Sequence, residues 1–214
     1  MLAWVDSAHA RFNTKLLKAE AREGKHYANQ LIHEARPMAL FVYRYFSASQ
    51  QVIITHVLGN QNYDGVVEDG RDRPELIRYL EVTTTLRTYE DVLRMEVLSK
   101  EGSVAAYGPV MAEGPRHRRI SIKATGVARE HKAIRADHLK LVQDVVERKV
   151  DNKYEPNTAL IVAVDDSVPF SQDDDIAELD ALVTKTLAPA LRETNFSLLA
   201  LEGSNGLHLF YSIV

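Results

Sequence analysis

The spacing of hydrophobic residues predicts helices at the start of the chain and strands after them. Over residues 7–36 the hydrophobic side chains recur at helical spacing, and Pro37 is a natural stop for one or two helices. The stretches 50–59, 62–70 and 77–85 then read as strands, because short apolar runs are separated by turn residues. This part of the sequence therefore predicts helices followed by a strand meander.

Helical and strand-like segments alternate in the rest of the chain. A helix is expected around 89–101, because Thr88 and Asp91 stand at capping-box spacing before it, and residues 118–126 alternate like a strand.

The last third of the chain predicts the centre of a sheet. A helix over 137–154, which starts at an aspartate N-cap, precedes an almost wholly apolar strand over 157–166. Residues 173–195 read as a helix that Pro189 kinks or splits, and 196–214 as two apolar runs around a turn. The order of elements predicts an α/β protein with a mixed sheet flanked by helices.

Composition indicates an ordinary globular protein. With 214 residues, 45% hydrophobic and 26% charged, the chain is expected to form a single domain over 1–214. It has no cysteine, which excludes disulfides, thiolate metal ligands and a cysteine nucleophile, and fits a reducing interior. No apolar run approaches the roughly 18 residues that a membrane span needs. We therefore expect a cytoplasmic protein without a membrane partner.

Two carboxylates in neighbouring predicted strands are the main candidates for chemistry. Asp64 lies in Tyr-Asp-Gly-Val-Val, and Glu81 stands in the otherwise neutral run YLEVTTT. If these strands pair as an antiparallel hairpin, side-chain alternation brings both acids to one face. Such a pair is neutralised by a cation or a shared proton, and hard oxygen ligands suit Mg²⁺ or Mn²⁺. The alternative is a solvent-facing Glu81 that pairs with Arg78 or Arg87.

These residues and the order of elements resemble the PD-(D/E)xK nuclease superfamily, which has the restriction-endonuclease-like fold. The resemblance covers roughly residues 10–166, interrupted by the inserted helix around 89–101. It implies that Asp64 and Glu81, with the backbone carbonyl of Val82, ligate a divalent metal. The shared order is a helix, the strand with Asp64, the strand with Glu81-Val82-Thr83, a further strand, the helix 137–154 and the buried strand 158–165.

The chain departs from this family at Thr83, where the family has a lysine that positions or activates the attacking water. A hydroxyl carries no positive charge and cannot replace an ammonium in stabilising an anion. Either the lysine function has moved or the activity is lost. The candidate replacements are Lys123 in the predicted strand, and Lys149 and Lys153, one turn apart in the following helix. For each lysine, a solvated surface position is the alternative.

Many members of this family place an extra acid in their first helix. Glu34, in the sequence LIHEA, is the candidate here, and Glu20 and Glu23 compete for the same role. The sequence leaves these three alternatives open.

A basic run is the best indication of a polyanion partner. Residues 116–135 contain seven lysines and arginines against one acid, Glu130, and phosphate neutralisation supplies most non-specific affinity for nucleic acid. An acidic region over 165–180, in which Asp165-Asp166 is expected to cap or solvate a strand end, offers an alternative electrostatic partner. The basic residues proposed for nucleic-acid contact are Arg116, Arg118, Arg119 and Lys153.

Two hypotheses from different classes follow. The first is a metal-dependent nuclease, with DNA as the favoured substrate, in which Asp64 and Glu81 hold Mg²⁺ or Mn²⁺. The second is a protein that keeps the fold but not the chemistry, and acts as a nucleic-acid-binding or assembly module. The apolar C-terminal run 207–214 is also a candidate homodimer surface.

Overall fold

The main part of the fold is a six-stranded mixed sheet with the order β1-β2-β3-β6-β7-β8. The computed structural model describes residues 31–47, 49–57, 61–85, 89–105, 107–114, 121–166, 170 and 172–213. The expectation of an α/β protein with a mixed sheet flanked by helices is confirmed. The strands of this sheet are β1 (Val52–His56), β2 (Gly65–Asp69), β3 (Tyr79–Thr84), β6 (Thr158–Val164), β7 (Phe196–Gly203) and β8 (His208–Ser212).

The sheet changes from antiparallel to parallel at β3. Strands β1, β2 and β3 form the antiparallel meander that the turn residues predict, whereas β6 pairs parallel with β3, and β7 parallel with β6. Strand β8 returns antiparallel to β7 as a hairpin. All seven residues of β6 are buried, which explains its continuous apolar sequence, because a central parallel strand is covered on both faces.

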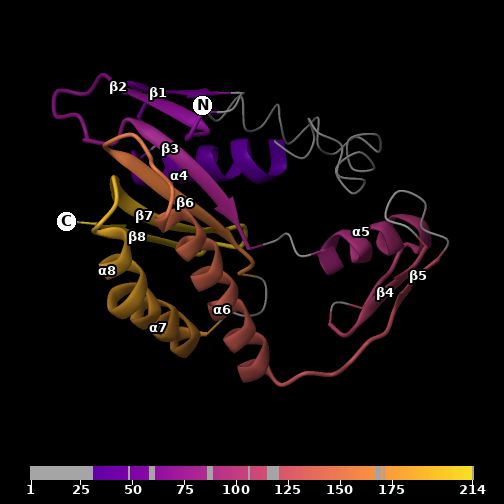
Figure 1. Ribbon diagram of the computed structural model, residues 1–214. Helices are drawn as coiled ribbons and strands as arrows, with labels where there is room; N and C mark the ends of the chain where they lie inside the picture. Colours follow the sequence, from indigo (N-terminus) through magenta and orange to yellow (C-terminus); the bar gives the residue numbers. More distant parts are fainter. Residues whose placement is uncertain are drawn as a thin grey trace.

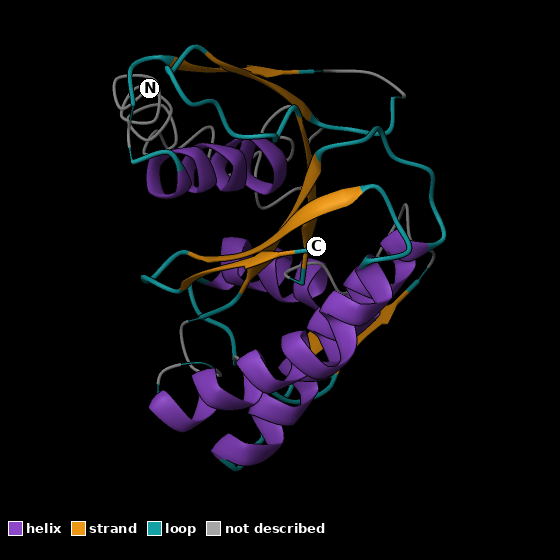
Figure 2. Cartoon of the chain, turned by 90° about the vertical axis from the view of Figure 1, so that its left-hand side faces the viewer, coloured by secondary structure: helices purple, strands orange, loops and turns teal. Residues whose placement is uncertain are grey.

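Helices cover both faces of this sheet (Figure 2). On one face, α4 (Arg36–Tyr45) packs Phe41 and Val42 against the sheet. The other face carries α6, α7, a π-helical turn η2 and α8, which enclose the second hydrophobic core with Leu160 and Val162. Their bounds are α6 (His131–Val150), α7 (Asp173–Leu182), η2 (Val183–Leu187) and α8 (Ala188–Leu191).

An excursion between β3 and α6 lies to one side of the sheet (Figure 1). It consists of α5 (Tyr89–Glu101), which agrees with the expected inserted helix, and a separate two-stranded sheet of β4 (Val110–Glu113) and β5 (Ser121–Ala124). The sequence pattern predicted β5 but not β4. Leu93 and Val97 of α5 are buried, yet they belong to neither of the two main hydrophobic clusters. The excursion therefore buries its own apolar side chains.

Two predicted helix ends are wrong. Pro37 does not stop a helix: it lies in the first turn of α4, directly after the π-helical turn η1 (Leu31–Ala35). Proline is tolerated there because its missing N–H would have no partner in a first turn. Residues 7–30 of the predicted helical region lie outside the described residues.

The helix predicted over 137–154 begins earlier than the sequence suggests. Helix α6 starts at His131, with Glu130 as N-cap, and not at Asp137. Its first turns are held by Arg135, whose guanidinium donates to Asp175 and, at 2.8 Å, to Glu178. These partners lie 40 or more residues away in the chain, so the local pattern does not reveal them.

The predicted break at Pro189 is confirmed. The π-helical turn η2 separates α7 from α8, and Pro189 lies in the first turn of α8. A proline inside a helix removes a hydrogen bond and clashes with the preceding turn, so the backbone widens ahead of it. Within the described part of the chain, no helix is both long and apolar enough to cross a membrane.

Candidate functional site

Asp64 and Glu81 lie close together at the open end of the β2–β3 hairpin. The antiparallel register ends with the pair Gly65 and Leu80, and just beyond it the backbone N–H of Asp64 donates to the carbonyl of Leu80 at 2.7 Å. Asp64 stands just before β2 rather than inside it, and its Oδ2 accepts a hydrogen bond of 2.8 Å from the backbone N–H of Val82. The carboxylate thus takes the place that a backbone carbonyl of an extended β2 would have.

The residue after Asp64 lies very close to α4. Gly65 follows Asp64, and a Cβ on Gly65 would lie only 2.7 Å from the Sδ of Met38 on α4. Real Cβ contacts are not that short, so a side chain at position 65 would require the flexible Met38 side chain to move. The hairpin end that carries Asp64 therefore rests directly on α4.

The side chain of Glu81 points to the face of the sheet on which α6 packs, and not to the α4 face. Its neighbours Leu80 and Val82 belong to the α4-side core, whereas Glu81 lies beside Leu160 in the α6-side layer. Glu81 is 8% exposed, and Lys149 Nζ in the last turn of α6 donates to Glu81 Oε1 at 2.6 Å. The structure therefore brings one of the three candidate lysines to the predicted carboxylate.

The electrostatics of Lys149 are dominated by this contact. Burial alone would lower the pKa of the Lys149 ammonium, but its hydrogen bond to Glu81 and the Glu81 charge outweigh burial and raise it. Lys149 is therefore a permanent cation at neutral pH. A positive charge, which Thr83 cannot provide, is thus present beside Glu81, and the residue that carries it belongs to α6.

Asp64 is the group in the site with the most perturbed protonation. Burial first, and then the negative charge of Glu81, raise the pKa of Asp64 from 3.8 to about 7. The Val82 N–H and the Lys149 charge act in the opposite direction, and Glu34 adds to the increase. Asp64 is therefore partly protonated near neutral pH.

Glu34 approaches the site from the α4 side of the sheet. It lies in η1, and its Oε2 is 3.2 Å from Nε2 of His56, the last residue of β1. His56 pairs in register with Gly65, the neighbour of Asp64. Of the three acids proposed for this role, Glu34 is the one that the structure describes, whereas Glu20 and Glu23 lie outside the described residues.

The backbone carbonyl of Val82 faces the same edge as Asp64. In a strand the N–H and the C=O of one residue point to the same side, and the Val82 N–H points to Asp64. The β2–β3 ladder ends at Gly65 and Leu80. The Val82 carbonyl therefore points to the edge of β3 beside Asp64, where β2 begins.

The other predicted residues lie elsewhere. Thr83 continues β3 on the same face as Glu81, in register with Val162. Lys123 is exposed on β5, opposite Met111 in the excursion, to one side of β3 (Figure 1). Lys153 lies beyond the end of α6, which corrects its predicted place one helical turn after Lys149, and its carbonyl accepts a 2.7 Å bond from Asn62.

The basic run is described only in part. Arg116, Arg118 and Arg119 lie outside the described residues, between β4 and β5 in the chain. Farther along the same run, Arg129 forms a 2.6 Å ion pair with Asp137, and Arg135 is bound to Asp175 and Glu178. Part of the run therefore serves the attachment of α6 and not a free basic surface.

Tyr154 is a residue of this site that the sequence pattern did not indicate. It is 7% exposed, and its ring packs against Phe196 with centroids 4.5 Å apart. Burial and the charge of Glu81 raise the pKa of its hydroxyl, against hydrogen bonds from Asn152 and Lys149. No motif spacing links Tyr154 to Glu81, because they meet only through the parallel pairing of β3 with β6.

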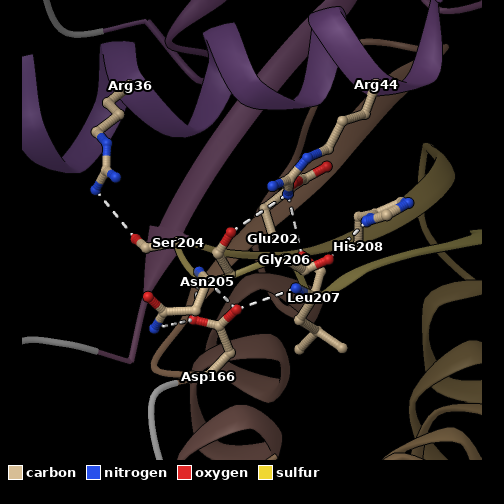
Figure 3. Close-up of polar contacts among 10 residues, drawn as sticks. Arg36, Arg44, Asp166, Glu202, Ser204, Asn205, Gly206, Leu207 and His208 are labelled. Atoms are coloured by element: carbon tan, nitrogen blue, oxygen red, sulfur yellow. Dashed lines mark hydrogen bonds and ion pairs between the residues drawn. The ribbon is translucent and has the colours of Figure 1, made fainter. Parts of the chain in front are cut away.

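A second polar cluster lies at the far end of β6 and β7 (Figure 3). Asp166 follows β6 and accepts hydrogen bonds from the backbone N–H groups of Asn205 and Leu207, at 2.8 to 3.0 Å, and from the Asn205 side chain at 3.1 Å. It holds the β7–β8 turn, which corrects the expectation that it caps or solvates a strand end. Nearby, Glu202 is buried and bound by Arg44 of α4.

No known family model matches the chain, and comparisons with curated proteins and with solved structures found no match. Within the described ranges, no group of three or more histidine, aspartate and glutamate side chains is arranged to hold a metal ion. The description of the site therefore rests on its own geometry: two neighbouring carboxylates, a lysine on one of them and a backbone carbonyl at the same edge.

Proposed function

We propose that this protein is a metal-dependent nuclease that hydrolyses phosphodiester bonds, with DNA as the favoured substrate. The observation that carries the proposal is the contact of Lys149 Nζ with Glu81 Oε1 at 2.6 Å, beside Asp64. An acid pair with an adjacent ammonium is what the resemblance to the PD-(D/E)xK superfamily requires, and Lys149 supplies the cation that Thr83 lacks.

The order of elements supports the same proposal. Helix α4 precedes the meander, Asp64 stands at the start of β2, Glu81 lies in β3, and α6 leads to the buried strand β6 parallel to β3. This is the order on which the resemblance rests, with α5, β4 and β5 inserted between β3 and α6.

The donor atoms fit a hard divalent cation. Asp64 and Glu81 are carboxylates, Val82 adds a carbonyl oxygen, and such oxygen ligands suit Mg²⁺ or Mn²⁺. Burial first, and then the Glu81 charge, raise the pKa of Asp64, and a bound divalent cation would stabilise its ionised form. Asp64, Glu81 and Val82 would hold the metal, and Glu34 would add to the negative potential.

A bound metal of this type would activate water and stabilise charge on the phosphate. The protein's own groups have separate parts. Glu81 orients Lys149, and the ammonium stabilises negative charge on a phosphate oxygen or on the attacking hydroxide. Asp64 is held in place by the Val82 N–H, so the two carboxylates are positioned before any ligand binds.

The second candidate is a nuclease-fold protein without catalysis, acting as a nucleic-acid-binding or assembly module. The observation that favours it is that the half-buried Lys149 already pairs with Glu81, which is sufficient to keep this carboxylate buried. In this case the site is structural, and any affinity for nucleic acid comes from the basic run.

The two candidates are separated by cleavage of DNA with Mg²⁺ or Mn²⁺. We expect the wild-type protein to cut, and Asp64→Asn, Glu81→Gln and Lys149→Met each to lose about 10²-fold or more in rate, as with other groups that stabilise charge. Glu113→Gln on exposed β4 is the matched control and should cut normally. Calorimetry should show metal binding that Asp64→Asn weakens.

Wild-type cleavage that persists in all three variants, or no metal binding, would contradict the nuclease proposal. The binding-module candidate then predicts DNA affinity that falls with added salt and decreases when Arg116, Arg118 and Arg119 are changed together. DNA affinity that is absent at low salt would contradict both candidates.

A further inference from the structure

Two tyrosines pack on each other beside the candidate site. Tyr63 directly precedes Asp64, and Tyr79 is the first residue of β3, two residues before Glu81. Their ring centroids lie 4.7 Å apart with the ring planes inclined at 42°, and both residues are partly exposed. Because alternate residues of a strand share one face, Tyr79 points to the same side of the sheet as Glu81. The ring pair therefore borders the two acids.

The loop that carries Tyr63 is held by hydrogen bonds on both sides of this residue. Gln61 Nε2 donates to the Tyr63 carbonyl at 3.1 Å. The backbone N–H of Asp64 donates to the carbonyl of Leu80 at 2.7 Å. The Tyr63 ring is thus placed against Tyr79 by the protein itself, which lowers the entropic cost of binding a ligand there.

The face of the sheet next to this ring pair is open. Across the sheet from Tyr79 the register continues with Val66 of β2 and Thr55 of β1, and among the described residues both lie outside the two main hydrophobic clusters. Thr55 is exposed, and so is the next pair on this face, Ile53 and Glu68, with 57% exposure for Ile53. Helix α6 packs on β3 and β6, farther along the sheet (Figure 1). The rings are therefore accessible from the side of β1 and β2.

Positive charge lies at the border of the ring pair. Asn62, the residue before Tyr63, donates from Nδ2 to the backbone carbonyl of Lys153 at 2.7 Å, so the exposed Lys153 side chain starts beside the loop. Lys149 reaches the same face of the sheet, where its ammonium lies 2.6 Å from Glu81. Aromatic rings that stack on a base, next to cations that neutralise phosphate, are the combination by which proteins bind single-stranded nucleic acid.

We propose that Tyr63 and Tyr79 form a stacking surface for an unpaired base of single-stranded DNA, with Lys153 on the phosphate backbone of the same strand. A base held there places its strand beside Asp64 and Glu81, so an unpaired strand and not an intact duplex is the substrate. This assignment of substrate rests on the proposed function. The stacking itself needs no metal and is measured without cleavage.

The test compares the affinity of the metal-free full-length protein for a fluorescently labelled oligothymidine of about 12 nucleotides, within the usual range of site sizes, and for the corresponding duplex. We expect the single strand to bind more tightly. Tyr63→Leu and Tyr79→Leu keep an apolar side chain without an aromatic face, and should each weaken single-strand binding roughly five- to hundredfold. Tyr63→Phe and Tyr79→Phe keep the ring and should bind like the wild type.

The matched control for the ring is Tyr43→Leu, which should bind like the wild type. Tyr43 is 44% exposed and belongs to α4, on the other face of the sheet. Urea unfolding of each variant shows whether it is folded. Because Tyr63 stands outside the strands, Tyr63→Leu decides the question even if Tyr79→Leu does not fold.

The phosphate contact is tested with Lys153→Met. We expect the slope of log K against log salt for the single strand to become smaller by about 0.7, the value for one phosphate contact. Lys185→Met is the matched control, since Lys185 is exposed on η2, and its slope should equal that of the wild type. An unchanged slope in Lys153→Met overturns the contact of Lys153 with the DNA backbone.

Folded leucine variants that bind the single strand as tightly as the wild type overturn the stacking role. A wild type that binds the duplex more tightly than the single strand also overturns it. A wild type that binds the single strand through these tyrosines, but cuts no DNA with Mg²⁺, contradicts the proposed function alone. Cleavage by the wild type, with single-strand affinity unchanged in the leucine variants, contradicts the stacking role alone.

Discussion

Glu202 shows what burial does to a single carboxylate in this fold. Its side chain is 0% exposed, one oxygen is bound by Arg44, and among the described residues the other oxygen, Oε1, has no hydrogen-bond partner. Burial outweighs the Arg44 charge and raises the pKa of Glu202 from 4.5 to about 7. Glu202 therefore changes charge within the physiological range.

We predict that this residue makes stability fall as the pH rises. A carboxyl with a higher pKa in the folded than in the unfolded state favours folding at acidic pH, and this contribution is lost between about pH 4.5 and 7. The loss is on the order of 3 kcal/mol. The free energy of unfolding, measured with urea from pH 4 to 8, should fall in the wild type relative to Glu202→Gln.

The comparison with Glu202→Gln isolates this one group, because all other titrating residues are shared. The glutamine keeps the shape and an acceptor for Arg44, so the difference between the two proteins should shift in favour of the variant between about pH 4.5 and 7 and stay constant above pH 7. A difference that does not depend on pH would show that Glu202 has the same pKa in the folded and the unfolded protein.

At the residue scale, the proximity of Asp64 and Glu81 could be predicted from the sequence, because two adjacent strands form a hairpin and period-two alternation is visible in the sequence. The selection of Lys149 over Lys123 and Lys153 was not predictable. It depends on where α6 ends and on which of its faces packs on β3, and long-range contacts fix both.

At the scale of elements, Asp166 fixes the β7–β8 hairpin through hydrogen bonds and packs closely against Gly203. Asp166 accepts hydrogen bonds from the turn, and a Cβ on Gly203 would lie 2.2 Å from its Oδ2. The sequence predicted the hairpin from its turn residues. It did not reveal these contacts, because Asp166 and Asn205 are 39 residues apart.

We predict that Gly203→Ala destabilises the protein by about 2 kcal/mol or more, because overpacking a close contact forces the backbone to move. The same substitution in an Asp166→Gly background should cost much less, since both the carboxylate and the Asp166 Cβ, which would lie 2.7 Å from the new methyl group, are gone. Urea unfolding of the four proteins in this double-mutant cycle measures the coupling. Additive effects would show that the clash is relieved by movement elsewhere.

Predicted elements were most accurate where the chain itself contains the signal. The strand at β6 and the break at Pro189 follow from an uninterrupted apolar run and from a proline. The start of α6 was not predicted because tertiary contacts determine it. The helical structure on both sides of Pro37 was not predicted because a π-helical turn leads directly into α4. Strand β4 was missed because it is short and pairs only with β5.

At the scale of the whole molecule, the excursion is a separate attachment to the six-stranded sheet. Its buried residues Leu93 and Val97 lie outside both main cores. The end of β3 is anchored without it, since Thr85 bonds the carbonyl of Ala163 through both its N–H and its hydroxyl. The β3–β6 pairing, and with it the Glu81–Lys149 contact, does not require the excursion.

We predict that replacing residues 89–124 with a short glycine-serine linker leaves a protein that unfolds cooperatively. Loops and insertions are tolerated when few core contacts cross their boundary. The check is urea unfolding together with amide hydrogen exchange, in which β6 and β7 should keep the strongest protection. Loss of cooperative unfolding would show that α5 contributes to the main core.

The approach of Gly65 to Met38 links the two faces of the molecule. Glu81 and Lys149 lie on the α6 side of the sheet, whereas Met38, which packs against Gly65, lies in the hydrophobic core on the α4 side. A larger residue at position 65 would press on the flexible Met38 side chain, so its effect on Asp64 depends on whether Met38 can move aside. The apolar packing on one face of the sheet thus bears on the acidic edge on the other, and a search limited to charged residues would overlook it.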